Sequence, residues 1–114
     1  MVTINDRNKT EKDALVILVS TDKHLDHVIN LTAAAWVKGK QVSLFFTGRG
    51  VLLTVDPRFR QLAGKADLNI CDASFRANGL HGREGEVPGV TIDDFVTQAK
   101  NARMLTDGTR HLVF

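Results

Sequence analysis

Cys71, the only cysteine of this 114-residue chain, is the side chain best suited to chemistry. It lies in the stretch LNICDASFRANG, from Leu68 to Gly79, where a short apolar run ends and a helix is predicted to begin. A thiol at that position is close to the positive end of the helix dipole, which favours the nucleophilic thiolate. Cys71 is therefore the candidate catalytic residue. The alternative is an inert, buried side chain, because cysteine is among the most buried residue types.

The elements before Cys71 predict a β-α-β unit. Residues 14–19 (ALVILV) form a continuous apolar run typical of a strand covered on both faces, and residues 41–46 (QVSLFF) predict a second strand. Between them, apolar residues at spacings of three and four predict a helix over residues 23–38, with N-caps available from Ser20 to Asp22 and Gly39 at its end. The connection in such a unit is right-handed, so the two strands are parallel.

The rest of the chain continues the same pattern. Residues 51–55 are predicted to be helical at first, and residues 66–71 predict a third strand whose alternating polar residues indicate one less covered face. A capping-box pattern at Thr91 predicts a final long helix, and residues 110–114 (RHLVF) predict a last strand. Pattern also favours core positions for Trp36 and two phenylalanines of the second strand. The predicted fold class is α/β.

Parallel topology predicts a site at one edge of the sheet. Ligands of open parallel sheets bind outside the carboxyl ends of the strands, where loops and helix N-termini converge. Thr47, Arg49 and the amides after Cys71 would stabilise an anion there, His24 could carry a proton, and Asp72 would disfavour the thiolate. The candidate substrate- or anion-binding residues are Lys23, His24, Thr47, Arg49, Asp72, Ala73 and Ser74.

Composition excludes several classes of function. A net charge of +2 without any tyrosine does not indicate a nucleic-acid partner, and no apolar run approaches the roughly 20 residues of a membrane span. A single cysteine forms no internal disulfide, which agrees with a reducing, cytoplasmic location. The polar residues 1–13 predict a flexible leader, followed by one domain over residues 14–114.

Two further motifs are weak. His24 and His27 are three residues apart, but no second ligand pair accompanies them, so no metal site is predicted. The sequence Gly48-Arg49-Gly50 could begin a dinucleotide-binding fingerprint, but Leu53 occupies the position of the third glycine. A small-nucleotide binder is accordingly the third hypothesis for function.

Taken together, several segments resemble the DsrE/DsrF-like family, which includes the Tus sulfur-relay subunits. The similar segments are FFTGRGVLL, LAGKADLNICDASFRANGL, VPGVTIDDFV and RHLVF, and the similarity covers residues 14–114. Its most specific parts are the FFT-x-x-G stretch and a cysteine that ends the third strand, eight residues before Gly79-Leu80. The resemblance implies a three-layer α/β/α sandwich with a mostly parallel sheet of four to five strands, commonly assembled into trimers or hexamers.

The resemblance also implies an activity. Active members accept a sulfane sulfur on the matching cysteine, here Cys71, as a persulfide and pass it to the next carrier without a cofactor. The leading hypothesis is therefore a sulfur-carrier or sulfurtransferase-like protein with protein sulfur donors and acceptors. The second hypothesis is a non-catalytic subunit of a homo-oligomer, or of a hetero-oligomer with related subunits, that docks a small ligand or a protein while Cys71 stays inert.

Overall fold

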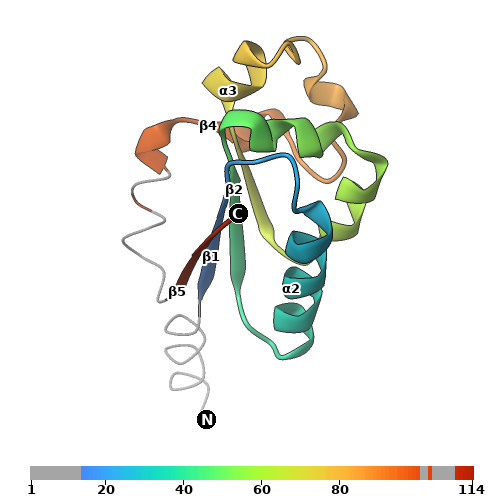
Figure 1. Ribbon diagram of the computed structural model, residues 1–114, viewed down its shortest axis with the longest axis vertical. Helices are drawn as coiled ribbons and strands as arrows, with labels where there is room; N and C mark the ends of the chain where they lie inside the picture. Colours follow the sequence, from blue (N-terminus) through green and yellow to red (C-terminus); the bar gives the residue numbers. More distant parts are fainter. Residues whose placement is uncertain (1–13, 101–102, 104–109) are drawn as a thin grey trace.

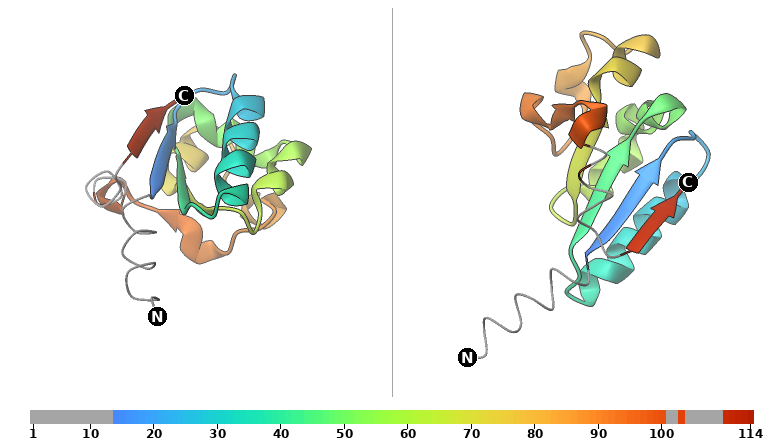
Figure 2. Two further views of the ribbon diagram at one scale, coloured as in Figure 1. Left: turned by 90° about the horizontal axis from the view of Figure 1, so that it is seen from below. Right: turned by 90° about the vertical axis from the view of Figure 1, so that its left-hand side faces the viewer.

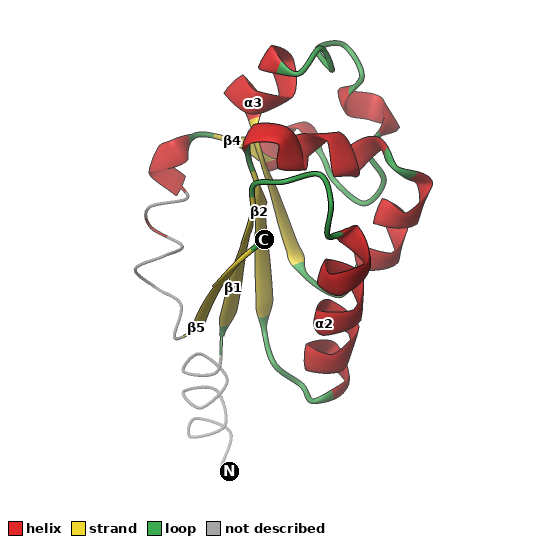
Figure 3. Ribbon diagram, viewed as in Figure 1, coloured by secondary structure: helices red, strands yellow, loops and turns green. Residues whose placement is uncertain are grey.

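The computed structural model describes residues 14–100, 103 and 110–114, and shows a five-stranded, all-parallel sheet in the order β4-β3-β2-β1-β5 (Figure 1). The strands are β1 (Leu15–Val19), β2 (Val42–Phe46), β3 (Asp67–Cys71), β4 (Phe95–Val96) and β5 (Arg110–Val113). Helices pack on this sheet, which confirms the predicted α/β sandwich (Figure 3). The predicted leader at residues 1–13 lies outside the described residues.

Helix α2 (Leu25–Val37) runs along one face of the sheet (Figure 2). Its buried residues are spaced by three and four positions, as an amphipathic helix requires: Leu25, Val28, Thr32 and Ala35. His24 occupies the N-cap position without a side-chain capping bond, so the predicted caps upstream do not begin the helix. Trp36 is 52% exposed, and its predicted core position was therefore wrong.

Shorter helices complete the chain. They are η1 (Gly48–Val55), η2 (Pro57–Leu62), α3 (Asp72–Ala77), η3 (Glu84–Glu86) and η4 (Ile92–Asp94). The predicted helical start of residues 51–55 is confirmed as part of the 3₁₀ helix η1. In Figure 1, η1 and α3 gather above the carboxyl ends of the central strands. No helix within the described ranges is long and apolar enough to cross a membrane.

The sheet separates two apolar clusters. On the α2 face the main core includes Phe46, whose ring meets Phe59 of η2 edge-on at 5.2 Å. On the opposite face a smaller cluster contains Val16, Phe45 and Cys71. Cys71 therefore points away from α2, because successive side chains of a strand alternate between faces.

The predicted less covered face of β3 is found only at Asp67, the exposed residue of the strand. Asn69 is 1% exposed, and its side-chain amide donates to the Leu44 carbonyl at 3.3 Å and to the Asp67 carboxylate at 3.2 Å. These hydrogen bonds satisfy a polar group that would otherwise be costly to bury. Asn69 is therefore buried although the alternating pattern predicts a less covered face.

The predicted long helix from Thr91 was also wrong in its first two turns. The capping box is present, with the Thr91 N–H donating to Asp94 Oδ2 at 2.8 Å, but it begins only the 3₁₀ turn η4. The next two residues then pair with β3 as strand β4, and residues 98–100 are helical. Phe95 packs edge-on against Phe75 at 5.0 Å, and this tertiary contact outweighs the local helical pattern.

The Gly-rich loop between α3 and β4 is anchored to the core. Leu80 and Val87 are 3% and 4% exposed, and both belong to the main apolar cluster. Arg83 binds Glu86 at 2.9 Å on its outer side. Two buried apolar side chains thus hold this loop against the core.

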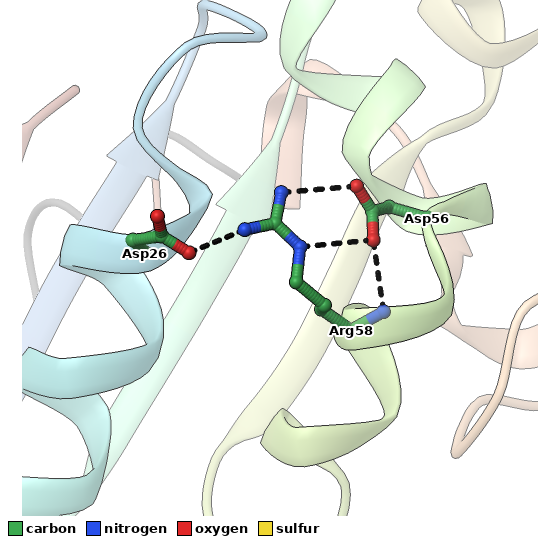
Figure 4. Close-up of polar contacts among 3 residues, drawn as sticks. All are labelled: Asp26, Asp56 and Arg58. Carbon is green, nitrogen blue, oxygen red and sulfur yellow. Dashed lines mark hydrogen bonds and ion pairs between the residues drawn. The ribbon is translucent and has the colours of Figure 1, made fainter.

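A polar cluster joins α2 to η2 (Figure 4). The Arg58 guanidinium donates to Asp56 at 3.2 and 3.1 Å and also binds Asp26 of α2. Hydrogen bonds from Arg58 lower the pKa of Asp56, and the carboxylates raise that of Arg58. These groups are largely exposed, so their contribution to stability is modest and decreases with salt.

Candidate functional site

The loops after β1 and β2 meet at the carboxyl edge of the sheet, as parallel topology predicts. The Thr47 N–H donates to the Val19 carbonyl at 3.0 Å. A Cβ atom at Gly50 would lie 2.1 Å from the same carbonyl oxygen, so the chain approaches this closely only because residue 50 has no side chain. Gly48 has a φ of +52°, which favours glycine. These two glycines therefore allow the loop after β2 to pack closely against the end of β1.

Cys71 lies at the end of β3 and is the N-cap residue of α3. Its residue surface is only 2% exposed. The sulfur nevertheless has polar neighbours, because it accepts hydrogen bonds from the Ser74 N–H at 3.5 Å and from Gln98 Nε2 at 3.3 Å. The thiol therefore has both apolar neighbours, Phe45 and Val16, and hydrogen-bond donors.

Ser74 connects the thiol to the loop after β2. Its hydroxyl oxygen accepts the Gly48 N–H at 3.0 Å and lies 3.3 Å from the Thr47 hydroxyl. Asn78 secures the same contact from the other end of α3 by donating to the Gly48 carbonyl at 3.1 Å and to the Ser74 carbonyl at 2.8 Å. Thr47, Ser74 and Gln98 thus form a connected polar cluster around Cys71, which we call the thiol cluster.

The thiol cluster shifts the acidity of Cys71. Burial raises the pKa of the thiol, but hydrogen bonds from Ser74, Gln98 and Thr47 outweigh it and place the pKa below its ordinary value of 9.0. The physical cause is that donors stabilise the anionic form more than the neutral form. The hydrogen bonds therefore make this covered thiol more acidic than an ordinary cysteine.

The structure brings together only some of the predicted site residues. Thr47 and Ser74 belong to the thiol cluster, whereas Ala73 is exposed on α3. Asp72 forms an ion pair with Arg76 at 2.9 Å, which offsets the negative charge expected to disfavour the thiolate.

The remaining candidates lie near the end of β1, at the carboxyl edge of the sheet. Arg49 pairs with Asp22 at 3.0 Å, and this contact, with a smaller effect from exposed Lys23, lowers the pKa of Asp22. The ring of His24 lies 6.0 Å from that of Phe114, beside β5. In the sheet, β2 lies between β1, which precedes His24, and β3, which ends at Cys71. The contacts of His24 therefore do not support its predicted role as a proton carrier.

Sequence reasoning missed Gln98 and the Gly48 amide. Gln98 is 27 residues from Cys71 and 51 from Thr47, and no local pattern indicates contacts at that range. Among the residues that the structure describes, no group of three or more His, Cys, Asp or Glu side chains could hold a metal ion.

No protein-family model and no curated protein matches this chain. The physical arrangement of the thiol cluster is therefore the basis on which a function must be argued.

The Ser74 hydroxyl is the component of the thiol cluster most directly tested by mutation. In Ser74→Ala the backbone N–H that donates to Cys71 is retained, but the hydroxyl is lost. Because that hydroxyl helps to lower the pKa of Cys71, we expect the pKa to rise and the pH profile of alkylation by iodoacetamide to move to higher pH. Stability should fall by about 1 kcal/mol through the lost Gly48 contact. Ser43→Ala, at the opposite end of β2, is the control and should leave the profile unchanged; an unchanged profile in Ser74→Ala would contradict the assignment.

Proposed function

We propose that the protein is a sulfur carrier that accepts a sulfane sulfur on Cys71 as a persulfide and passes it to a partner. The single observation that carries the proposal is the pair of hydrogen bonds that the Cys71 sulfur accepts, from the Ser74 N–H and from Gln98 Nε2. Donors aimed at a sulfur atom favour its thiolate, and the thiolate is the form that attacks sulfur. The resemblance to DsrE/DsrF-like sequences supports the same activity.

The proposed reaction is a thiol–disulfide type of exchange in two steps. The Cys71 thiolate attacks the outer sulfur of a donor persulfide, forming a new S–S bond as the donor S–S bond breaks. The donor leaves as a thiolate and takes up a proton from solvent, while Cys71 carries the terminal sulfur as an anion. An acceptor thiolate then attacks that terminal sulfur and releases the Cys71 thiolate. Neither step requires a metal or an external oxidant, and no cofactor takes part in the proposal.

The partners in this proposal are a donor and an acceptor protein that carry reactive thiols. The carrier itself would assemble as a trimer or hexamer, or with related subunits, as the family resemblance suggests. Because the proposed reaction begins from a free Cys71 thiol, which a reducing compartment preserves, a cytoplasmic location fits the proposal.

One observation favours a second candidate function. At 2% exposure, Cys71 is as buried as the apolar residues around it. In the second candidate, the protein is a non-catalytic subunit, the thiol fills space beneath α3, and the rim of the sheet docks a protein or a small ligand. The two candidates differ in whether a sulfur donor reaches the thiol of the folded protein.

Intact-mass measurement separates the two candidates. The folded protein is incubated with a small-molecule persulfide donor, and we expect the mass of one sulfur atom to be added, removable by dithiothreitol and absent in Cys71→Ser. Transfer of the added sulfur to a second thiol, such as glutathione, should restore the original mass. No adduct on the folded wild-type protein, combined with an adduct after denaturation, would overturn the sulfur-carrier proposal and favour the inert thiol.

A further inference from the structure

A pocket of about 250 Å³ lies between α2 and the edge strand β5, at the end of the sheet opposite to the thiol cluster. Leu15 and Arg110, the first residues of β1 and β5, both line it, so the pocket lies beside the amino ends of these strands. All of its lining residues belong to the described part of the chain, and most of them are apolar: Leu15, Leu31, Ala34, Ala35, Lys38, Lys40, Arg110 and Leu112.

The packing of α2 explains why a pocket forms here. The helix side of the lining comes from positions 31, 34, 35 and 38, a spacing that places these residues on one face of the helix. Two of the four are alanines, Ala34 and Ala35, whose side chains are short. On the facing edge strand, Leu112 remains 41% exposed. The helix therefore leaves part of the apolar surface of β5 uncovered.

Positive charges border this apolar lining. Lys38, at the C-cap of α2, and Arg110, at the start of β5, both line the pocket and are exposed to solvent. Within the described ranges, neither the Lys38 ammonium nor the Arg110 guanidinium forms an ion pair. Lys40 adds a third positive charge, and no acidic residue is part of the lining. The complement of this pocket is therefore a ligand with an apolar part and a negative charge.

We propose that the pocket binds a small carboxylate with an apolar tail, such as a medium-chain fatty acid. The tail packs on Leu31, Ala34 and Leu112, and the carboxylate binds Lys38 and Arg110, whose guanidinium can donate two parallel hydrogen bonds to it. Sites for drug-sized ligands enclose roughly 300–1,000 Å³, so this smaller pocket suits a short ligand. The inference goes beyond the sulfur-carrier function and does not depend on it, because the thiol cluster contributes no residue to the pocket.

The test titrates the isotope-labelled full chain with butyrate, hexanoate and octanoate and follows the backbone amide signals by NMR. We expect saturable shifts concentrated on residues 31–38 and 110–112. The affinity should rise about fourfold for each added methylene until the pocket is full, which corresponds to about 0.8 kcal/mol per buried methylene. Octanol, which replaces the carboxylate by a neutral hydroxyl, should bind about tenfold more weakly than octanoate, because a hydrogen bond to a charged group contributes about 1.5 kcal/mol.

Variants test the two parts of the site separately. Arg110→Gln and Lys38→Gln each remove one positive charge and should weaken octanoate binding about tenfold while leaving octanol binding unchanged. Ala34→Leu fills the pocket from an exposed helix position that accepts leucine, and it should weaken the binding of both ligands. The matched control is Arg60→Gln, which removes the charge of an exposed arginine on η2 and should bind octanoate as wild type does.

Absence of saturable shifts with octanoate would overturn the proposal, as would equal affinities for octanol and octanoate. Unchanged octanoate binding in both Arg110→Gln and Lys38→Gln would remove the carboxylate from the assignment and overturn it as well. Shifts of residues 31–38 and 110–112 that depend on protein concentration without any ligand would instead assign the pocket to a second copy of the chain. None of these outcomes alters the persulfide measurement on Cys71, so failure of the pocket and failure of the carrier function are distinguishable.

Discussion

Replacing Gly50 by alanine is expected to destabilise the protein by about 3 kcal/mol. The added Cβ atom would lie 2.1 Å from the Val19 carbonyl oxygen and 2.7 Å from its carbonyl carbon, far inside contact distance. Both atoms belong to the backbone at the end of β1, so no side-chain rotation relieves the clash. The loop after β2 must move instead, which would break the hydrogen bond from the Thr47 N–H to the same carbonyl. Urea denaturation followed by circular dichroism measures the loss.

Gly85→Ala is the matched control for this prediction. Nothing lies within 4 Å of a Cβ atom built at Gly85, and its backbone does not require glycine. We expect its free energy of unfolding to change by less than about 1 kcal/mol, with a slight gain from the reduced entropy of the unfolded chain. Equal stability of the two variants would show that the approach of η1 to β1 is not as tight as described.

Sequence patterns correctly predicted the helices and strands that are marked by local, repeated spacing of apolar residues. The apolar runs of β1 and β2, and the regular spacing of apolar residues in α2, each demand one kind of element, and the parallel topology then follows. Patterns failed where a distant contact decides the outcome. Thr91 begins a capping box, but the packing of Phe95 against Phe75 and the pairing with β3 convert the predicted helix into a strand.

In the candidate site, too, local sequence and topology predicted some features, and distant contacts decided the others. The position of Cys71 at the carboxyl end of a strand, and its proximity to the loop after β2, follow from topology alone. The Ser74 donor to its sulfur is local, but the Gln98 donor depends on the path of the chain just after β4, which brings Gln98 to within 3.3 Å of a residue 27 positions away. Charged candidates were over-weighted because sequence does not reveal that Asp72 is paired with Arg76 or Arg49 with Asp22.

Phe75 is the residue through which the core supports the thiol cluster. It is fully buried, at 0% exposure, and lies next to Ser74 on a helix of only 6 residues. A helix that short is not stable by itself, so its position depends on this anchor. The Phe75 ring also packs edge-on against Phe95 of β4, with ring centroids 5.0 Å apart. Gln98 follows the end of β4 by two residues, so this contact links α3 to the segment that carries Gln98.

Phe75→Ala is therefore expected to lower the free energy of unfolding by about 3–5 kcal/mol, through lost burial and the cavity left behind. It should also loosen α3, so that Cys71 in the folded protein is alkylated faster than in wild type. Phe75→Leu fills most of the space and should cost much less, about 1.5 kcal/mol, with alkylation close to wild type. Urea denaturation and alkylation rates on the same samples measure both effects. A destabilised Phe75→Ala variant with unchanged alkylation would mean that the thiol is held by β3 and the hydrogen bonds of Ser74 alone, without the support of the core through Phe75.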